Sequence, residues 1–299
     1  MDLDRLLVMD GATGTNLQNM YIPDDVWEGK EGCNEWLNLA YPEVIVKLHQ
    51  DFIQAGSQAV ETNTFGANRL TLAEYGLEDR VNDINFAAVF NARKAALELG
   101  TTTYVVGSMG PGTKLPTLGQ VEIDDLIFAL CEQARALIVA GADAIIIETS
   151  QDLEQVKTAV RSVFQVMRYT KHIPLMVSVT MENTGTMLLG TDIAAVAATL
   201  EPLPVSSLGL NCATGPNEME SHIRYLKENW NRPISCMPNQ GLPEIFDGKT
   251  VYNLSPEAFA AKMLYFVETY DIRVVGGCCG TTPAHIQALT AALQDKGLL

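Results

Sequence analysis

Three of the six cysteines in this 299-residue chain stand where a metal-binding or reactive thiol is usually placed, just after buried apolar segments. Cys212 belongs to the segment NCATGP at 211–216, and the adjacent Cys278 and Cys279 belong to GGCCGTTP at 276–283. Thiolates are soft ligands that favour zinc, and three protein ligands leave one tetrahedral position open for a substrate. These residue types therefore predict a catalytic zinc site on Cys212, Cys278 and Cys279.

Two other interpretations of these cysteines stay open on the residues alone. Cysteine is among the most buried residue types, so Cys212 by itself is also consistent with a small core residue. The adjacent pair could instead be a redox pair. Neighbouring residues of a straight strand point to opposite faces, so Cys278 and Cys279 reach one ion only if the backbone bends there. We expect the flanking glycines at 276, 277 and 280 to permit that bend.

The elements that must position these thiols alternate eight times along the chain. The apolar segments are rich in Val, Ile and Leu, and several are continuously apolar, which is typical of strands buried on both faces of a parallel sheet. Strands are predicted at 6–9, 59–62, 104–107, 144–147, 175–179, 207–210, 234–237 and 273–275. Helices are predicted at 43–55, 81–99, 124–140, 153–167, 193–200, 218–229, 256–269 and 283–293; in the fourth, Asp152 is expected to cap and Gln155 to complete a capping box.

This alternation, without a linker-like break, predicts an α/β fold of the (β/α)₈ barrel type that spans 1–299 as a single domain. A doubly wound open sheet is the alternative. In a barrel the active site lies at the carboxyl ends of the strands, so Cys212 after the sixth strand and Cys278 and Cys279 after the eighth share one rim. This shared position favours the metal interpretation. The loop at 14–40, which carries Trp27 and Trp36, is expected to cover the barrel mouth.

Other rim residues carry weaker signals. Glu148 follows the fourth strand, and a carboxylate at this rim usually has a ligand, a metal or an acid–base task. The segment DGATG at 10–14 is consistent either with a ligand loop or with a tight turn that binds nothing. The loop after the eighth strand leads into a helix N-terminus, a common phosphate site, but it contains no Lys or Arg. Phosphate is therefore not expected there.

Composition excludes several classes of partner. The chain has 20 Lys and Arg against 36 Asp and Glu, a net charge of −16, which repels nucleic acid and anionic membrane surfaces. Its N-terminus lacks the order of a signal peptide, and no apolar run approaches the ~18 residues of a membrane span. Six cysteines are too few for a disulfide scaffold. We therefore expect a cytoplasmic protein with no nucleic-acid or membrane partner.

Taken together, the motifs resemble the homocysteine-binding methyltransferase family, and within it the homocysteine domain of the cobalamin-dependent branch. The resemblance spans nearly the whole chain. It is carried by DGATGT at 10–15, ETNTFG at 61–66, GSMGP at 107–111, Glu148-Thr149, Asn211-Cys212, Pro238-Asn239 and GGCCGTTP at 276–283. The GGCCG signature paired with an upstream Asn-Cys is highly specific.

The resemblance implies a site and a reaction. Zn²⁺ would be bound by Cys212, Cys278 and Cys279, with Asn239 as a fourth ligand that homocysteine displaces. The substrate would be held by Glu148 and Asp10 and by backbone amides of the glycine-rich loop. The implied substrate-binding residues are Asp10, Gly11, Ala12, Thr13, Gly14, Glu148 and Asn211. The reaction implied is methyl transfer to the homocysteine thiol to give methionine.

The methyl donor stays open at this point. No folate or cobalamin domain fits within the chain, so the resemblance implies methylcobalamin held by a corrinoid-carrying domain or a separate protein. The chain would then be either a fragment or a short stand-alone protein. Betaine or S-methylmethionine as a free donor is the alternative within the family. Two further alternatives are an inert module that presents homocysteine and a barrel lyase or isomerase that uses Glu148 as a base.

Overall fold

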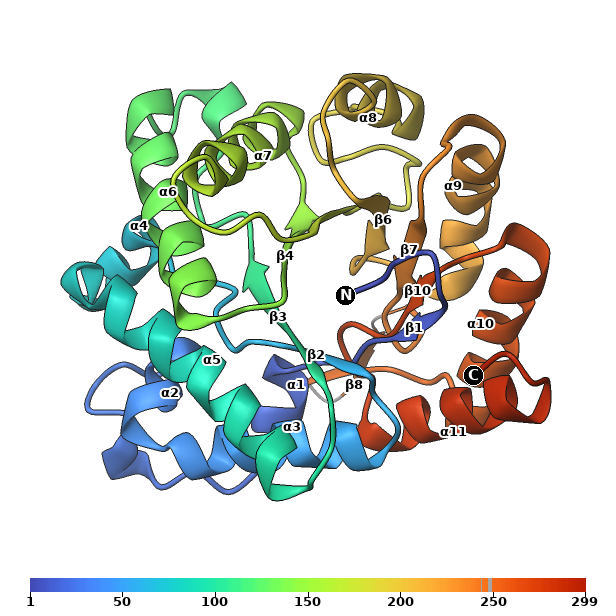
Figure 1. The fold of residues 1–299 in the computed structure, drawn as a ribbon, viewed down its shortest axis with the longest axis horizontal. Helices are drawn as coiled ribbons and strands as arrows, with labels where there is room; N and C mark the ends of the chain where they lie inside the picture. The colour runs from blue at the N-terminus through green and yellow to red at the C-terminus, as the bar shows by residue number, and fades with distance from the viewer. Residues whose placement is uncertain (243, 247–248) are drawn as a thin grey trace.

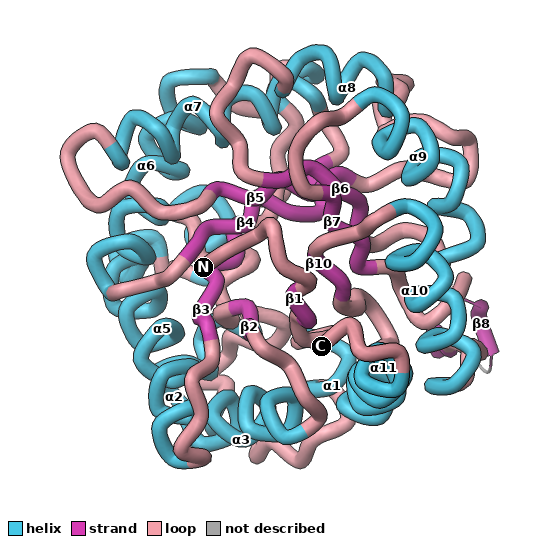
Figure 2. The backbone as a smooth tube through the Cα atoms, turned by 45° about the vertical axis from the view of Figure 1, so that its right-hand side comes forward, coloured by secondary structure: helices cyan, strands magenta, loops and turns pink. Residues whose placement is uncertain are grey.

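The computed structural model describes residues 1–242, 244–246 and 249–299, and its centre is one sheet of eight parallel strands. The strands lie in the order β1-β10-β7-β6-β5-β4-β3-β2, inside a ring of helices (Figures 1 and 2). They are β1 (Leu7–Val8), β2 (Ala59–Glu61), β3 (Tyr104–Met109), β4 (Ala144–Ser150), β5 (Leu175–Val179), β6 (Ser207–Asn211), β7 (Ile234–Met237) and β10 (Val274–Val275).

The sheet closes on itself between its two end strands. The Gln58 backbone N–H donates to the Val8 carbonyl at 2.8 Å, and the Gln58 side-chain oxygen accepts from the Val8 N–H at 3.0 Å. Strands that follow one another in the chain are therefore neighbours all the way round, with β10 beside β1. This confirms the predicted (β/α)₈ barrel, and the doubly wound alternative is wrong.

Eight long helices pack around the strands at the predicted places. In the described part of the chain the helices are α1 (Gly14–Leu17), α2 (Leu37–Ala40), α3 (Pro42–Gln54), α4 (Arg69–Leu72), α5 (Val81–Glu98), α6 (Ile123–Ala140), α7 (Leu153–Met167), α8 (Ile193–Leu200), α9 (Pro216–Asn229), α10 (Pro256–Tyr270) and α11 (Pro283–Asp295). Short 3₁₀ turns lie at Asp24–Val26, Asn34–Trp36, Ala73–Tyr75, Glu78–Arg80 and Pro116–Leu118. None of the helices described here combines the length and apolar character that crossing a membrane requires.

Three local features differ from the sequence-based expectations. Asp152 caps α7 as predicted by accepting from the Glu154 and Gln155 N–H groups, but the Gln155 side chain bonds the Pro111 and Lys114 carbonyls and completes no capping box. An antiparallel hairpin, β8 (Glu244–Phe246) and β9 (Lys249–Val251), is inserted between β7 and α10. The loop at 14–40 also contains less irregular structure than expected, because two α-helical and two 3₁₀ turns interrupt it.

The barrel interior is filled with apolar side chains and sealed at its amino-terminal end. Leu7, Met9, Ile146 and Met176 pack together there, and Leu3 of the N-terminal segment joins them at 7% exposure. In Figure 1 the N-terminus accordingly lies inside the ring of helices. Because this end is plugged, the carboxyl ends of the strands are the end of the barrel that is left for a ligand.

Strands β3 and β4 run further toward that rim than predicted. The predicted strands ended at residues 107 and 147, whereas β3 reaches Met109 and β4 reaches Ser150. The pairing of β4 with β5 shifts register between Ile147 and Ser150, and Thr149 has a φ of 55°. Glu148 is therefore held on a strand next to a bulge, which fixes its direction more firmly than a loop would.

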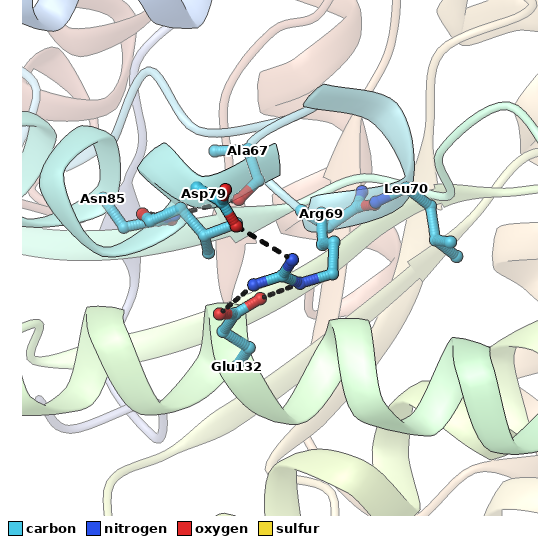
Figure 3. Close-up of polar contacts among 8 residues, drawn as sticks. Ala67, Arg69, Leu70, Asp79, Asn85 and Glu132 are labelled. Atoms are coloured by element: carbon cyan, nitrogen blue, oxygen red, sulfur yellow. Dashed lines mark hydrogen bonds and ion pairs between the residues drawn. The ribbon is translucent and has the colours of Figure 1, made fainter. Parts of the chain in front are cut away.

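The segment after β2 is anchored to the helical ring by one arginine. Arg69, the first residue of α4, donates from Nε and Nη2 to the two Glu132 oxygens of α6, each at 3.0 Å. Its Nη1 lies 3.4 Å from Asp79, and Figure 3 shows the guanidinium between the two carboxylates. This fork ties the turn that carries rim residues 62–66 to α6.

Candidate active site

A cavity of 340 Å³ opens at the carboxyl ends of the strands. Its wall is built from the carboxyl ends of β2, β3, β4, β6 and β7 and from the segments that follow β1, β2, β6 and β10, together with Asn34 and Glu35 of the first loop. Trp36 does not face it but is buried against Leu72 and Val81. The loop therefore contributes to the mouth through its polar residues. Within the described residues, the wall contains no lysine, arginine or histidine.

The three predicted thiols meet at one side of this cavity. The sulfurs of Cys212, Cys278 and Cys279 all lie within 4.8 Å of one another, and those of Cys212 and Cys279 are 3.8 Å apart. A tetrahedral zinc ion with Zn–S bonds of about 2.3 Å holds its sulfur ligands about 3.8 Å apart. The donor set and its spacing thus fit a zinc ion. The remaining cysteines, Cys33, Cys131 and Cys236, lie elsewhere, as the sequence predicted.

Unusual backbone brings these sulfurs together. Cys212 and Ala213 have φ values of 61° and 57°, in the left-handed region that side chains other than glycine rarely adopt. Gly280 has a φ of 80°, as expected of a glycine that bends the chain. Gly276 and Gly277 serve a different purpose: a Cβ at these positions would lie 2.8 Å from the Asp10 carbonyl and 2.3 Å from the Thr281 hydroxyl oxygen respectively. They are needed for close approach.

Without a cation the three thiols hold their charge on one sulfur. Hydrogen bonds from Cys212 and Cys278 lower the pKa of Cys279 to about 3, and the bonds that Cys278 makes to Cys212 and Cys279 raise its own pKa well above the usual value. Three thiolates at this spacing repel one another strongly, so complete ionisation requires a bound cation. The three thiols are therefore suited to bind a cation.

Two carboxylic acids lie on the other side of the cavity. Glu148 is 6% exposed, accepts from the Ser108 hydroxyl at 2.5 Å and from the Asn211 amide at 3.3 Å, and hydrogen-bonds Glu61. Burial raises the pKa of both acids, and the Glu148 charge raises that of Glu61 further. These shifts favour a single proton held between the two carboxyl groups. Because no basic side chain faces the pair, a cationic ligand is the group that this wall is suited to bind.

Asn211 connects the two sides of the cavity. Its amide nitrogen donates to the Thr149 hydroxyl at 2.7 Å and lies 3.9 Å from the Cys278 sulfur, while its oxygen accepts from the Thr149 N–H at 2.9 Å. Asn211 thus fixes the distance between the acid pair and the thiols. It lines the cavity, as the resemblance implied.

The residues of the segment at 10–14 do not all face the cavity. Gly11, Ala12, Thr13 and Gly14 line the cavity as expected. Asp10 lies behind the wall at 3% exposure, where its carboxylate accepts from the Glu61 N–H at 3.0 Å and its carbonyl accepts from the Gly277 N–H at 3.0 Å. In this arrangement Asp10 joins β1 to β2 and to the second cysteine segment.

Asn239 lies between the two cysteine segments. Its N–H donates to the Thr214 carbonyl at 3.1 Å, and the preceding Pro238 carbonyl accepts from the Cys278 N–H at 2.8 Å. Asn239 is 2% exposed and its side-chain oxygen has no hydrogen-bond partner. A buried, unpartnered carbonyl oxygen beside a thiol cluster is consistent with a ligand atom.

Several residues at the site were given no role in the sequence analysis, although Glu61 and Ser108 stand in motifs that carry the family resemblance. Glu61, Ser108 and Glu35 line the cavity, and the ring of Tyr252 packs against Gly280, next to Cys279 in the chain. Glu61 ends a short apolar segment just as Glu148 does, so the same signal would have found it. Glu35 lies in the first loop and Tyr252 follows the unpredicted hairpin, so no periodic pattern marked either of them. Their positions depend on tertiary folding.

Comparison with known proteins agrees with this architecture. The homocysteine S-methyltransferase family model matches residues 7–293. The chain is 47% identical over 295 residues to methionine synthase of Mycobacterium tuberculosis and 46% identical over 293 residues to that of Mycobacterium leprae. Each match covers 97% of this chain, but the chain spans only 25% and 24% of the length of these relatives.

A solved structure shares the fold. The metallated form of the homocysteine methyltransferase MmuM of Escherichia coli superposes with a TM-score of 0.75 at 24% identity, over 96% of each chain. The class defined by the fold and the site is therefore a (β/α)₈ barrel with a thiol cluster and an acid pair at its carboxyl rim. Within that class, this chain belongs to the homocysteine S-methyltransferase family.

Proposed function

We propose that this chain binds homocysteine and zinc at the rim cavity and presents the homocysteine sulfur for methylation to methionine, with methylcobalamin as the donor. The observation that carries the proposal is one cavity with three converging thiols on one side and an acid pair on the other, of which Glu148 is buried and Glu61 half-buried. Homocysteine has a thiol at one end and an α-ammonium group at the other, so it matches both sides of the cavity.

The thiol end is assigned to Cys212, Cys278 and Cys279, with Asn239 as the displaceable fourth ligand. A zinc ion held there would lower the pKa of the homocysteine thiol from about 8.5, so that the sulfur is ionised at neutral pH. Cys212 and Cys278 come from different strand ends, so the barrel itself sets their separation. Asn211 keeps the acid pair at a fixed distance from them.

The amino-acid end is assigned to Glu148 and Glu61, with the glycine-rich loop at 11–14 facing the carboxylate. The substrate ammonium displaces the shared proton of the acid pair, because a full positive charge satisfies two buried carboxylates better than one proton does. Ser108 and Asn211 keep Glu148 in place meanwhile. The homocysteine thiolate would then attack the methyl carbon in a single in-line displacement. The C–S bond would form as the methyl–cobalt bond of the donor breaks, and the electron pair of that bond would leave with the cobalt.

The first test is zinc binding. Cys212→Ala, Cys278→Ala and Cys279→Ala should each lose the one zinc per chain and all homocysteine binding, measured by metal analysis and calorimetry. Circular dichroism should show that the barrel remains folded, because these residues lie at the rim. Cys131→Ala, a partly buried cysteine on α6, is the matched control and should keep both. Stoichiometric zinc in Cys212→Ala would contradict the assignment.

The donor test separates the candidate functions. With methylcobalamin, zinc-loaded chain and homocysteine should form methionine slowly, since the donor must collide with an open mouth. A cobalamin-carrying partner domain should raise the rate by raising effective concentration. No methionine should form from betaine. Fast turnover of betaine or S-methylmethionine would assign a free-donor reaction, and tight homocysteine binding without turnover of any donor would assign a binding module.

A further inference from the structure

The glycine-rich loop at 11–14 and the second cysteine segment at 278–281 meet at one buried threonine. Thr281 is fully buried, and its hydroxyl donates to the Cys278 carbonyl at 2.6 Å. The same hydroxyl oxygen accepts from the Ala12 N–H at 3.2 Å, and the Thr281 carbonyl accepts from that N–H at 3.3 Å. A single residue therefore joins the loop assigned to the substrate carboxylate to the backbone of a proposed zinc ligand.

Two glycines make room for this hydroxyl. A Cβ at Gly11 would lie 2.7 Å from the Thr281 hydroxyl oxygen, and a Cβ at Gly277 would lie 2.3 Å from it. Gly11 precedes Ala12 and Gly277 precedes Cys278, so the hydroxyl is wedged between the two segments that it joins. Close-packed interiors have low compressibility and transmit strain, so a displacement of one segment would be passed to the other.

A second contact runs parallel to the first. Asn16 of α1 donates from its side-chain amide to the Ala12 carbonyl at 2.6 Å and to the Thr281 carbonyl at 2.8 Å. The Thr15 hydroxyl accepts from the Gly280 N–H at 3.1 Å. Neither Asn16 nor Thr281 lines the cavity. Both residues therefore act behind its wall, where they can position the loop without touching the substrate.

We propose that Thr281 is a positioning residue that couples the zinc site to the substrate loop, so that zinc and the amino-acid end of the substrate bind cooperatively. The inference rests on the proposed function. A zinc ion would tie Cys278 and Cys279 to Cys212 and would thereby fix the Cys278 carbonyl. Through the Thr281 hydroxyl, that carbonyl would hold the Ala12 N–H. The substrate would then meet a loop that is already ordered, which raises its affinity.

One experiment follows the loop with no substrate present. Hydrogen–deuterium exchange of the peptide covering residues 10–17 is measured by mass spectrometry in the zinc-free and the zinc-loaded chain. Zinc should slow this exchange about fivefold or more in the wild type, as expected for typical coupling between sites. The effect should be much smaller in Thr281→Val, which keeps the side-chain shape but not the hydroxyl. Thr290→Val changes a buried threonine of α11 whose hydroxyl has no partner; it is the matched control and should respond like the wild type.

Two further variants make this experiment decisive. Thr281→Ser keeps the hydroxyl and should restore the response to zinc. Asn16→Ala removes the parallel contact, leaves Thr281 in place and should also reduce the response. Circular dichroism checks folding, and Asn16→Ala decides alone if Thr281→Val does not fold. The proposal is wrong if zinc slows exchange equally in the wild type, Thr281→Val and Asn16→Ala, or does not slow it in the wild type.

A second experiment measures the coupling to a ligand. 2-Aminobutyrate has the amino-acid end of homocysteine but no thiol, so zinc cannot bind it through sulfur. Calorimetry should show that zinc raises its affinity about fivefold or more in the wild type and less in Thr281→Val. Attraction between the zinc charge and the carboxylate alone would give the same gain in both proteins and would overturn the role of Thr281. Absence of 2-aminobutyrate binding to the zinc-loaded wild type would count against the proposed function, and the exchange measurement would then decide the coupling by itself.

Discussion

Glu148 is held by contacts with Ser108, Asn211 and Glu61, and its charge is the property we assign to substrate recognition. Glu148→Gln keeps the shape and the Ser108 and Asn211 partners but removes the negative charge. Homocysteine affinity should fall about tenfold or more, as expected for a lost charge-assisted bond, while zinc content stays the same. Calorimetry and metal analysis check this. Loss of zinc together with affinity would place Glu148 in the support of the metal instead.

The acid pair also predicts how stability depends on pH. Burial raises the pKa of Glu61 well above its ordinary 4.5, so the folded chain binds a proton that the unfolded chain releases. The stability from this proton is fully present below pH 4.5 and is lost as pH rises through the folded pKa. Glu61→Gln should therefore stabilise the ligand-free chain by roughly 1 kcal/mol or more at pH 8 and hardly at all at pH 4.5.

Urea unfolding of Glu61→Gln and wild type at both pH values measures this difference. Glu98→Gln, an exposed acid on α5, is the control and should show no such trend. A difference that is the same at pH 4.5 and pH 8 would mean that Glu61 carries no shared proton. Saturating homocysteine should abolish the gain, because its ammonium takes the place of the proton.

The residues of the site were predictable to different degrees. Cys212, Cys278 and Glu148 directly follow continuous apolar segments, so position along the chain was enough to place them at one rim. The contact of Glu61 with Glu148 and that of the Tyr252 ring with Gly280 join residues that are far apart in sequence, and no local pattern encodes them. The left-handed backbone at Cys212 was also invisible, since only tertiary constraint holds a cysteine there.

At the scale of elements, the Arg69 fork decides how firmly the turn after β2 is held. Arg69→Met should lower the stability by about 1 kcal/mol, because it removes a bidentate pair from a half-buried position. The midpoint of thermal unfolding should fall by roughly 2–4 °C. Homocysteine affinity should weaken as well, since Glu61 begins the same segment. Arg5→Met, which removes an exposed pair with Asp2, is the control and should change neither quantity.

The elements themselves were well predicted because the continuous apolar pattern of the strands differs so clearly from the amphipathic pattern of the helices. Continuous apolar strands and amphipathic helices placed all eight repeats, with most boundaries within a few residues. The extension of β4 to Ser150 was not seen, because Glu148 and Thr149 are polar and read as the start of a loop. The β8–β9 hairpin was missed for the opposite reason: the prediction looked for repeats of strand and helix, and this insertion follows neither.

For the whole molecule, zinc binding and the stability of the folded chain should be thermodynamically linked. Cys212 follows β6, and the other two proposed ligands, Cys278 and Cys279, follow β10, so a shared ion would connect separate parts of the barrel rim. Zinc at a hundred times its dissociation constant adds about 2.7 kcal/mol, so the thermal midpoint should rise by roughly 5 °C or more. A chelator should reverse the shift without unfolding the chain. Calorimetry of Cys212→Ala should show no zinc-dependent shift.

The left-handed conformation of Cys212 has a consequence for how the domain would change over generations. At a φ of 61° glycine fits without strain, whereas any other side chain costs on the order of 1 kcal/mol. Only its proposed role as a metal ligand favours a cysteine at this position. A copy of the domain released from its reaction should therefore drift at residue 212 first, toward glycine or asparagine, and become more heat-resistant as it does so. Selection of a randomised library for folding alone would reveal this order of loss.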